Sequence, residues 1–264
     1  MEMPASSEDH ITAIRRQFGT SAQDYVRSSV HAAGDDLETL ASWAEGVPDK
    51  RLLDIATGGG HTALRMAGLY GEVVASDITE EMLGAAREFI EAQGARNVTF
   101  ALADAEDLPF PAAAFDAVSC RIAAHHFRRP ERFVSEVVRV LKPGGIFLLE
   151  DSIAPEHWGL AMTLNEVERL RDPTHVRSLT ETEWLALMNQ AGFEVEERAI
   201  DRKRHDLDNW MGRSRTPPDA GSQIQKLFSP DEPERVEAFG LEFDADGRCV
   251  AFTDEKLLVK GRKL

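Results

Sequence analysis

The sequence predicts an α/β fold built around a mostly parallel sheet. From Arg51 onward, short apolar segments alternate with segments whose apolar residues recur at helical spacing. The first apolar segment stops at an acid and is followed by three consecutive glycines, 58–60, as at a tight turn from a strand into a helix. Because strand, helix and strand follow one another at this interval, we expect parallel strands with right-handed crossovers.

Five strands and three helices are expected in the regular part of this alternation. The strands are expected at 51–55, 72–76, 98–102, 116–120 and 145–150. The helices are expected at 61–69, 79–93 and 130–141. The second helix has the clearest boundaries, because Thr79 is a suitable N-cap and Gly94 a suitable stop.

The alternation becomes less regular after Glu150. Helices near 156–171 and 180–191 precede a sixth strand, FEVEERAI, and residues 201–239 are expected to form an irregular polar stretch. Asp246-Gly247 then signals a hairpin turn, and 256–260 is the expected last strand. Ahead of Arg51, residues 8–45 are polar and have a helical period, with breaks at Gly19 and Gly34.

Composition and charge argue against several classes of function. The 46 acidic and 30 basic residues give a formal net charge of −16, which disfavours general binding to nucleic acid. No apolar run is long enough to span a bilayer, and MEMPASSEDH lacks the apolar core of a secretory signal. Two cysteines, Cys120 and Cys249, suit a reducing interior, and no metal-ligand motif is present. We therefore expect a cytoplasmic protein without a metal ion or a membrane partner.

The glycine loop has three interpretations. Residues 58–63, GGGHTA, satisfy G-x-G-x-x-A, and Asp77 follows at the spacing of a dinucleotide fingerprint. The same glycines also fit a plain strand-to-helix turn, or a loop that binds S-adenosylmethionine (SAM). Asp54 favours SAM, because a carboxylate at the mouth of the loop would repel a pyrophosphate but attract a sulfonium and an ammonium.

Two further acids end successive strands. Asp77, in VVASDIT, can accept hydrogen bonds from both ribose hydroxyls, and Asp104, in FALADAEDLPF, can accept one from the adenine amino group. Each acid alone is more commonly a solvated loop residue or a helix cap. Together with Asp54 they would line the carboxyl edge of the sheet, where ligands bind in such folds.

Segment 51–151 resembles the core of a class I SAM-dependent methyltransferase, in particular the broad group that includes the ubiquinone and menaquinone C-methyltransferases. The resemblance rests on LLDIATGGG, VVASDITEEML, ALADAEDLPFPAAAFDAVSCRIAAHHF and RVLKPGGIFLLED, which occur in the family's order. It implies a Rossmann-like fold with a seven-stranded sheet, mostly parallel, whose last strand is antiparallel. An N-terminal helical cap and a helical insertion are also implied.

The resemblance further implies one methyltransferase domain over 1–264. Its parts would be the cap at 8–45, the SAM-binding core at 51–151, helices with the sixth strand and the substrate-side insertion at 152–239, and a C-terminal hairpin at 240–264. SAM would be the cofactor and S-adenosylhomocysteine (SAH) its product. The implied cofactor-binding residues are Tyr25, Asp54, Ala56, Thr57, Gly58, Gly60, Asp77, Ile78, Met82, Asp104, Ala105 and Arg121.

Two features depart from the family pattern. Ala56 stands where the first glycine of the loop is usual, and its methyl group is tolerable if φ is negative. CRIAAHH follows the fourth strand where quinone methyltransferases usually carry a Gly-x-Arg-Asn type sequence, which argues against a quinone acceptor.

His125 and His126 are the candidate catalytic residues, because they follow the fourth strand, where the acceptor is expected. A general base is needed only if the nucleophile must lose a proton. In the alternative, one histidine packs on the sheet and the other caps a turn. Arg121 would line the methionine end of the cofactor or join a structural hydrogen-bond network. The motif of exocyclic-amine methyltransferases and the thiols of arsenite chemistry are missing, so a small-molecule acceptor is the default.

Several hypotheses stay open at this point. The local excess of basic residues at 198–215, with further arginines at 169–177, predicts an anionic acceptor; a solvated charged face is the alternative. Residues 8–30, with Phe18 and Tyr25, are expected to form a lid that becomes ordered around the cofactor, unless they are a fixed cap. A homodimer is also open. The alternatives to a methyltransferase are a SAM-binding protein without transferase activity and an NAD-dependent oxidoreductase.

Overall fold

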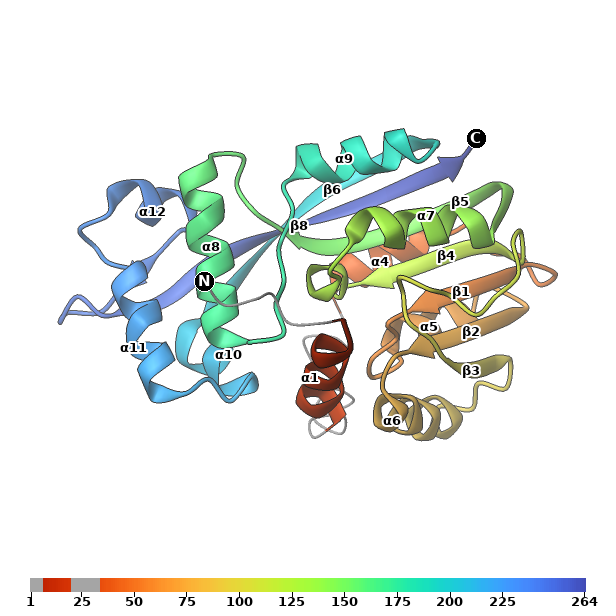
Figure 1. The fold of residues 1–264 in the computed structure, drawn as a ribbon, viewed down its shortest axis with the longest axis horizontal. Helices are drawn as coiled ribbons and strands as arrows, with labels where there is room; N and C mark the ends of the chain where they lie inside the picture. Colours follow the sequence, from red (N-terminus) through yellow and green to blue (C-terminus); the bar gives the residue numbers. More distant parts are fainter. Residues whose placement is uncertain (1–6, 20–33) are drawn as a thin grey trace.

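The computed structural model describes residues 7–19 and 34–264 of the chain. Its main sheet has the strand order β3-β2-β1-β4-β5-β8-β6, and the short strand β7 pairs with β8 beside this path (Figure 1). The strands are β1 Arg51–Ile55, β2 Glu72–Asp77, β3 Val98–Leu102, β4 Phe115–Arg121, β5 Leu141–Ile153, β6 Phe193–Asp206, β7 Glu242–Phe243 and β8 Cys249–Lys263. β1 to β5 pair in parallel, whereas β8 is antiparallel to both β5 and β6. The predicted fold class is confirmed.

Helices cover both faces of this sheet. On one face, α7 (Pro130–Val140) and α9 (Glu181–Gln190) bury Phe133 and Trp184 against the strands. On the other face lie α4 (Asp35–Trp43), α5 (His61–Ala67) and α6 (Glu80–Ala92). The sequence dictates these boundaries locally: Thr180 and Glu183 form a capping box at the start of α9, and Gly94 takes a φ of 84° just beyond the end of α6.

A second group of elements, the outer lobe, lies at one end of the molecule (Figure 1). It consists of α8 (Trp158–Arg171), α10 (Leu207–Arg213), α11 (Pro218–Leu227), α12 (Pro233–Ala238), β7 and the far ends of β6 and β8. Its own apolar cluster includes Trp210, Ile224, Phe228 and Phe252. β6 and β8 run from the main sheet into this lobe and join the two parts.

The expectation of an irregular stretch at 201–239 is wrong. β6 continues to Asp206, paired with β8 as far as Ala251, and three short helices follow. The strand is hard to see in the sequence because DRKRHD is almost entirely charged. Its outward side chains are instead held by exposed ion pairs to neighbouring strands, Arg202 with Glu255 and Arg204 with Glu242. β8 is also longer than the expected 256–260, because it extends back to Cys249 and on to Lys263. The predicted hairpin at Asp246-Gly247 is confirmed.

At the N-terminal side, the expected helical period appears as two separate helices. α1 (Ser7–Gly19) lies across the junction of the main sheet and the outer lobe, and α4 packs on the sheet (Figure 1). The glycines expected as breaks stand at the end of α1 and just ahead of α4. Tyr25 and His31 lie outside the described residues.

Candidate active site

The glycine loop follows β1 and is held in shape by two acids. Asp54 accepts hydrogen bonds from the hydroxyls of Thr57 (2.7 Å) and Ser119 (2.6 Å), and Asp77 Oδ2 accepts one from the Gly58 N–H (3.0 Å). Gly58 has a φ of 52°, and a Cβ added there would meet nothing within 4 Å. The backbone of the loop is therefore open on this side, so a ligand can approach it closely.

Ala56 and Gly60 flank this open position. Ala56 has a φ of 53°, so the condition under which its methyl group would be tolerated without strain is not met. The residue is held in the left-handed region, at a cost of about 1–2 kcal/mol. Gly60 has a φ of 85°, and a Cβ there would lie 2.8 Å from Ile90 Cδ1 on α6. Gly60 thus permits close packing of two helices, and it is not among the residues that line the cavity described below.

Three acids end adjacent strands at one edge of the sheet. Burial raises the pKa of Asp54 to about 6, against the hydrogen bonds from Ser119 and Thr57. Burial also raises the pKa of Asp77, although the N–H groups of Gly58 and Thr79 oppose this by donating to its two oxygens. Asp104, after β3, accepts from the Glu106 N–H (2.8 Å). Each carboxylate keeps further lone pairs for a ligand.

These strand ends border one cavity of about 620 Å³. It extends from the glycine loop to the outer lobe, and α1 contributes to its wall through His10, Ile11, Ile14 and Phe18. The structure brings the remaining sequence-predicted cofactor residues to this cavity: Asp54, Ala56, Thr57, Gly58, Asp77, Ile78, Met82, Asp104, Ala105 and Arg121. Both candidate catalytic residues, His125 and His126, also line it.

His125 and His126 occupy a short 3₁₀ turn after β4, but their environments differ. His125 Nδ1 lies 2.6 Å from Asp151 Oδ1 on β5. A carboxylate can only accept, so Nδ1 carries the proton and Nε2 is left as the acceptor of a neutral ring. Burial lowers the pKa of His125, but the charges of Asp151, Glu168 and Asp172 outweigh it and the net shift is upward. Burial and the neighbouring His125 lower the pKa of His126 to about 3, and its Nδ1 donates to the Thr174 carbonyl (3.0 Å).

The backbone just ahead of these histidines is strained. Ile122 has a φ of 53°, which is an outlier for a β-branched residue, and its N–H donates to the Glu150 carbonyl (2.8 Å). Strain of this kind persists only where the surrounding structure imposes it, and it is concentrated at functional sites. It turns the chain from β4 into the histidine turn.

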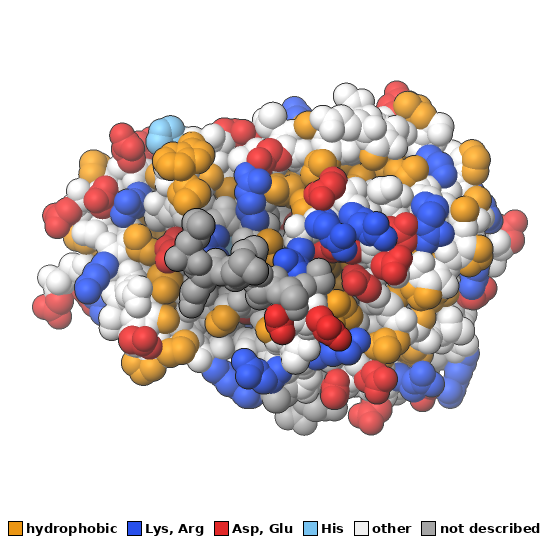
Figure 2. Space-filling model, in the orientation of Figure 1, with side chains coloured by type: hydrophobic (Ala, Val, Ile, Leu, Met, Phe, Trp, Pro, Cys, Tyr) orange, Lys and Arg blue, Asp and Glu red, His pale blue; other side chains and the backbone are white. Residues whose placement is uncertain are grey.

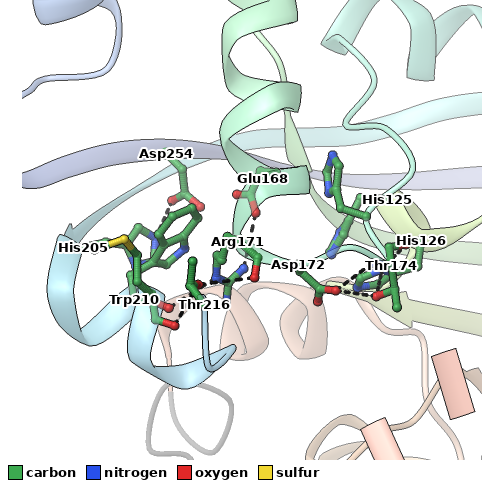
Figure 3. A network of polar contacts seen from close by, with 12 residues as sticks. His125, His126, Glu168, Arg171, Asp172, Thr174, His205, Trp210, Thr216 and Asp254 are labelled. Atoms are coloured by element: carbon green, nitrogen blue, oxygen red, sulfur yellow. Dashed lines mark hydrogen bonds and ion pairs between the residues drawn. The ribbon is translucent and has the colours of Figure 1, made fainter. Parts of the chain in front are cut away.

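A network of polar side chains from α8, α10 and β8 surrounds the far part of the cavity (Figure 3). Asp172 accepts hydrogen bonds from the backbone N–H and the hydroxyl of Thr174, and this hydroxyl lies beside His126 Nδ1. Arg171 pairs with Glu168 (3.3 Å) and stacks 4.4 Å above the Trp210 ring. His205 Nε2 lies 2.9 Å from Asp254 Oδ1. Apart from His126 and Arg171, the sequence did not indicate these residues as a site, because four segments far apart in the chain contribute them.

Arg121 belongs to a buried ionic cluster that ties α4 to the sheet. It lies 2.7 Å from Asp36 and 3.6 Å from Glu150, and it donates to the Thr62 hydroxyl (3.1 Å). Burial raises the pKa of Glu150 to about 8. The pKa of Asp36 is lowered, because the charge of Arg121 and the hydrogen bonds to Asp36 together outweigh the effect of burial. The expected structural network of Arg121 is present, and Arg121 also lines the cavity.

The basic residues at 198–204 do not reach the cavity. Arg198, Arg202 and Arg204 form exposed ion pairs with Glu181, Glu255 and Glu242. Figure 2 shows basic and acidic side chains interspersed over the visible face, without a broad patch of one sign. Arg171, Arg213 and Arg215 do line the cavity.

The described part of the chain, residues 7–19 and 34–264, contains no cluster of three or more side chains that could hold a metal ion. None of its helices has the length and apolar character needed to cross a bilayer.

Comparison with known proteins matches the methyltransferase domain family to residues 53–149. The uncharacterized methyltransferase YcgJ of Bacillus subtilis is 37% identical over 252 residues, which cover 93% of this chain and 97% of YcgJ. The crystal structure of YcgJ superimposes with a TM-score of 0.84 at 36% identity, covering 87% of this chain and 98% of YcgJ. The ubiquinone/menaquinone biosynthesis C-methyltransferase UbiE of Azotobacter vinelandii is 40% identical over 111 residues, 40% of this chain and 44% of UbiE.

Proposed function

Because this chain belongs to the class I methyltransferases, we propose that it transfers a methyl group from SAM to a small-molecule acceptor in the cytoplasm. The observation that carries the proposal is one cavity that joins an open glycine loop and three strand-end acids to a histidine with a free acceptor nitrogen. In this proposal the chain works as one methyltransferase domain. The core at 51–151 binds the cofactor, and the helices of 152–239 enclose the acceptor.

The residues at the loop fit SAM better than a dinucleotide. The open space at Gly58 admits a ligand against the backbone, while Asp54 and Asp77 place negative charge where a pyrophosphate would have to lie. In the proposed mode, Asp54 and Thr57 face the cationic methionine end, Asp77 holds the ribose hydroxyls, and Asp104 holds the adenine amino group. No metal ion is part of the proposal.

When bound, SAM supplies an electrophilic methyl group on a sulfonium, and SAH is the product. The protein's part is to orient the acceptor and to take its proton. In the proposed mechanism His125 Nε2 receives that proton as the acceptor's lone pair forms the new bond to carbon. Asp151 holds the ring in the correct tautomer and stabilises the imidazolium that results. The low pKa of His126 makes it a poor proton acceptor, so His125 is the base we propose.

The test combines binding with turnover. Calorimetry measures SAH affinity, and labelled SAM with a library of small molecules measures methyl transfer by the wild type and by His125→Asn. We expect SAH to bind both proteins, and kcat to fall about 100-fold or more in the variant. SAH binding without any methylated product would favour a SAM-binding protein without transferase activity. Binding of NAD but not SAH would favour an oxidoreductase.

A further inference from the structure

Lys256, on β8, is a buried basic residue that lines the cavity and has no hydrogen-bond or ion-pair partner among the described residues. Its side chain is only 4% exposed. A buried ammonium is costly unless it is paired. The neighbouring strands do not pair it: Asp201, opposite on β6, is not within ion-pair distance, and Ser152, opposite on β5, carries no charge.

The charges of nearby acids act on Lys256, but each acid has another cationic or histidine partner or is shifted toward its neutral form. Asp254, two residues away on the same face of β8, contacts His205, and Asp36 pairs with Arg121. Glu150 has a pKa of about 8 through burial, so it is mostly protonated at neutral pH. Lys203, on β6, adds a second positive charge nearby, and burial together with Lys256 lowers the pKa of Lys203. Lys256 therefore faces the cavity without an ion-paired acid among the described residues.

Extending the proposed function, we propose that Lys256 binds a carboxylate of the acceptor, so that the substrate is a compact organic acid. Ser152 lies directly opposite Lys256 in the register of β5 and β8 and also lines the cavity, so its hydroxyl can donate to the same carboxylate. Ser152, Lys256 and the proposed base His125 all line the same cavity. The acid group and the methylated atom would then lie on neighbouring parts of a small molecule.

The methionine carboxylate of SAM is the other possible source of such a group, and the strand order argues against it. Three strand spacings, roughly 14 Å, separate β8 from β1, which carries the glycine loop. The proposed methionine site lies over β1 and β4, beside Thr57 and Arg121. Lys256 is placed instead between that site and the outer lobe.

The test uses the protein saturated with SAH and four probes: acetate, benzoate and the matching amides, acetamide and benzamide. Binding is measured by ligand-detected NMR for the wild type, Lys256→Met, Lys256→Arg and Lys226→Met. Lys226, in α11, is a matched control because its removal changes net charge equally and it does not line the cavity. We expect the wild type, Lys256→Arg and Lys226→Met to prefer each acid over its amide at least tenfold. In Lys256→Met that preference should fall below threefold.

Equal binding of acids and amides by the wild type, or an unchanged preference in Lys256→Met, would overturn the proposal. A tenfold loss of SAH affinity in Lys256→Met would assign the carboxylate to the cofactor and would overturn it as well. If Lys256→Met does not fold, the acid-to-amide binding ratios of the wild type and of Lys256→Arg still test the proposal. Failure of the wild type to bind SAH at all would be a failure of the proposed function itself, which calorimetry detects separately.

Discussion

Asp77 offers the sharpest test of the proposed cofactor site, because both of its oxygens already have known protein partners. They accept from the N–H groups of Gly58 and Thr79, each at 3.0 Å. Replacing Asp77 with alanine removes the carboxylate that would hold the ribose. Each charge-assisted hydrogen bond is worth about 1.5–3 kcal/mol, so loss of one bond lowers SAH affinity roughly 10- to 150-fold, and loss of two lowers it further.

The same substitution also acts on stability. It leaves two N–H groups without their acceptor, which costs about 1–3 kcal/mol for each one that water does not reach. In the other direction, the alanine variant no longer has to bury a carboxylate, whose desolvation costs stability and raises its pKa in the wild type. We expect a net loss of about 1–3 kcal/mol in urea unfolding, together with weaker binding.

Calorimetry with SAH measures the effect on the cofactor, and circular dichroism checks the fold. Asp107→Ala is a suitable control, because Asp107 is an exposed acid a few residues beyond the same strand end as Asp104. It should bind SAH like the wild type. If Asp77→Ala binds SAH within threefold of the wild type, Asp77 does not hold the ribose.

Four further predictions follow from the geometry. Asp151→Asn should lower the pKa of His125 and so move the acid limb of the kcat profile to lower pH. In the wild type, the raised pKa of His125 contributes stability below the pKa of an unfolded histidine, about 6.5, and this contribution is lost as pH rises through the folded pKa. Urea unfolding of Asp151→Asn should therefore show the loss of that contribution at low pH. Ala56→Gly should raise the free energy of unfolding by about 0.5–1 kcal/mol in urea titrations, because glycine tolerates the φ of 53°. Glu150→Gln should gain stability relative to the wild type between pH 5 and 8, since the folded pKa of about 8 makes the wild type lose stability as pH rises over that range; parallel pH curves would contradict this. Residues 7–19 should gain protection from hydrogen exchange when SAH binds, whereas equal protection would indicate a fixed cap.

The glycine-loop side of the cavity was predictable from sequence because its requirements are local. A strand, a glycine loop and an acid at the end of the next strand are fixed by short spacings, and the structure brings Asp54, Gly58 and Asp77 together as expected. The positive φ of Ala56 was not predictable, since alanine carries no signal for the left-handed region.

The far part of the cavity, where we propose that the acceptor binds, was not predictable, because it depends on register between strands distant in the chain. Glu150 and Asp151 are adjacent in sequence, yet they face opposite sides of the sheet. Glu150 meets Arg121, and Asp151 meets His125. Only the position of β5 in the sheet decides which acid serves which partner. The position of Lys256 in the cavity wall likewise depends on the placement of β8 between β5 and β6.

The position of β8 has a consequence for how the chain folds. β6 is joined to the main sheet only through β8, although β6 comes earlier in the sequence. The pairing of β5 with β8 closes a loop of about a hundred residues, and contacts of such high sequence separation form slowly. Until β8 inserts, the edges of β5 and β6 remain unpaired and open to intermolecular strand pairing. We therefore expect the order of assembly to run from the glycine-loop core outward, with the acceptor end of the cavity formed last.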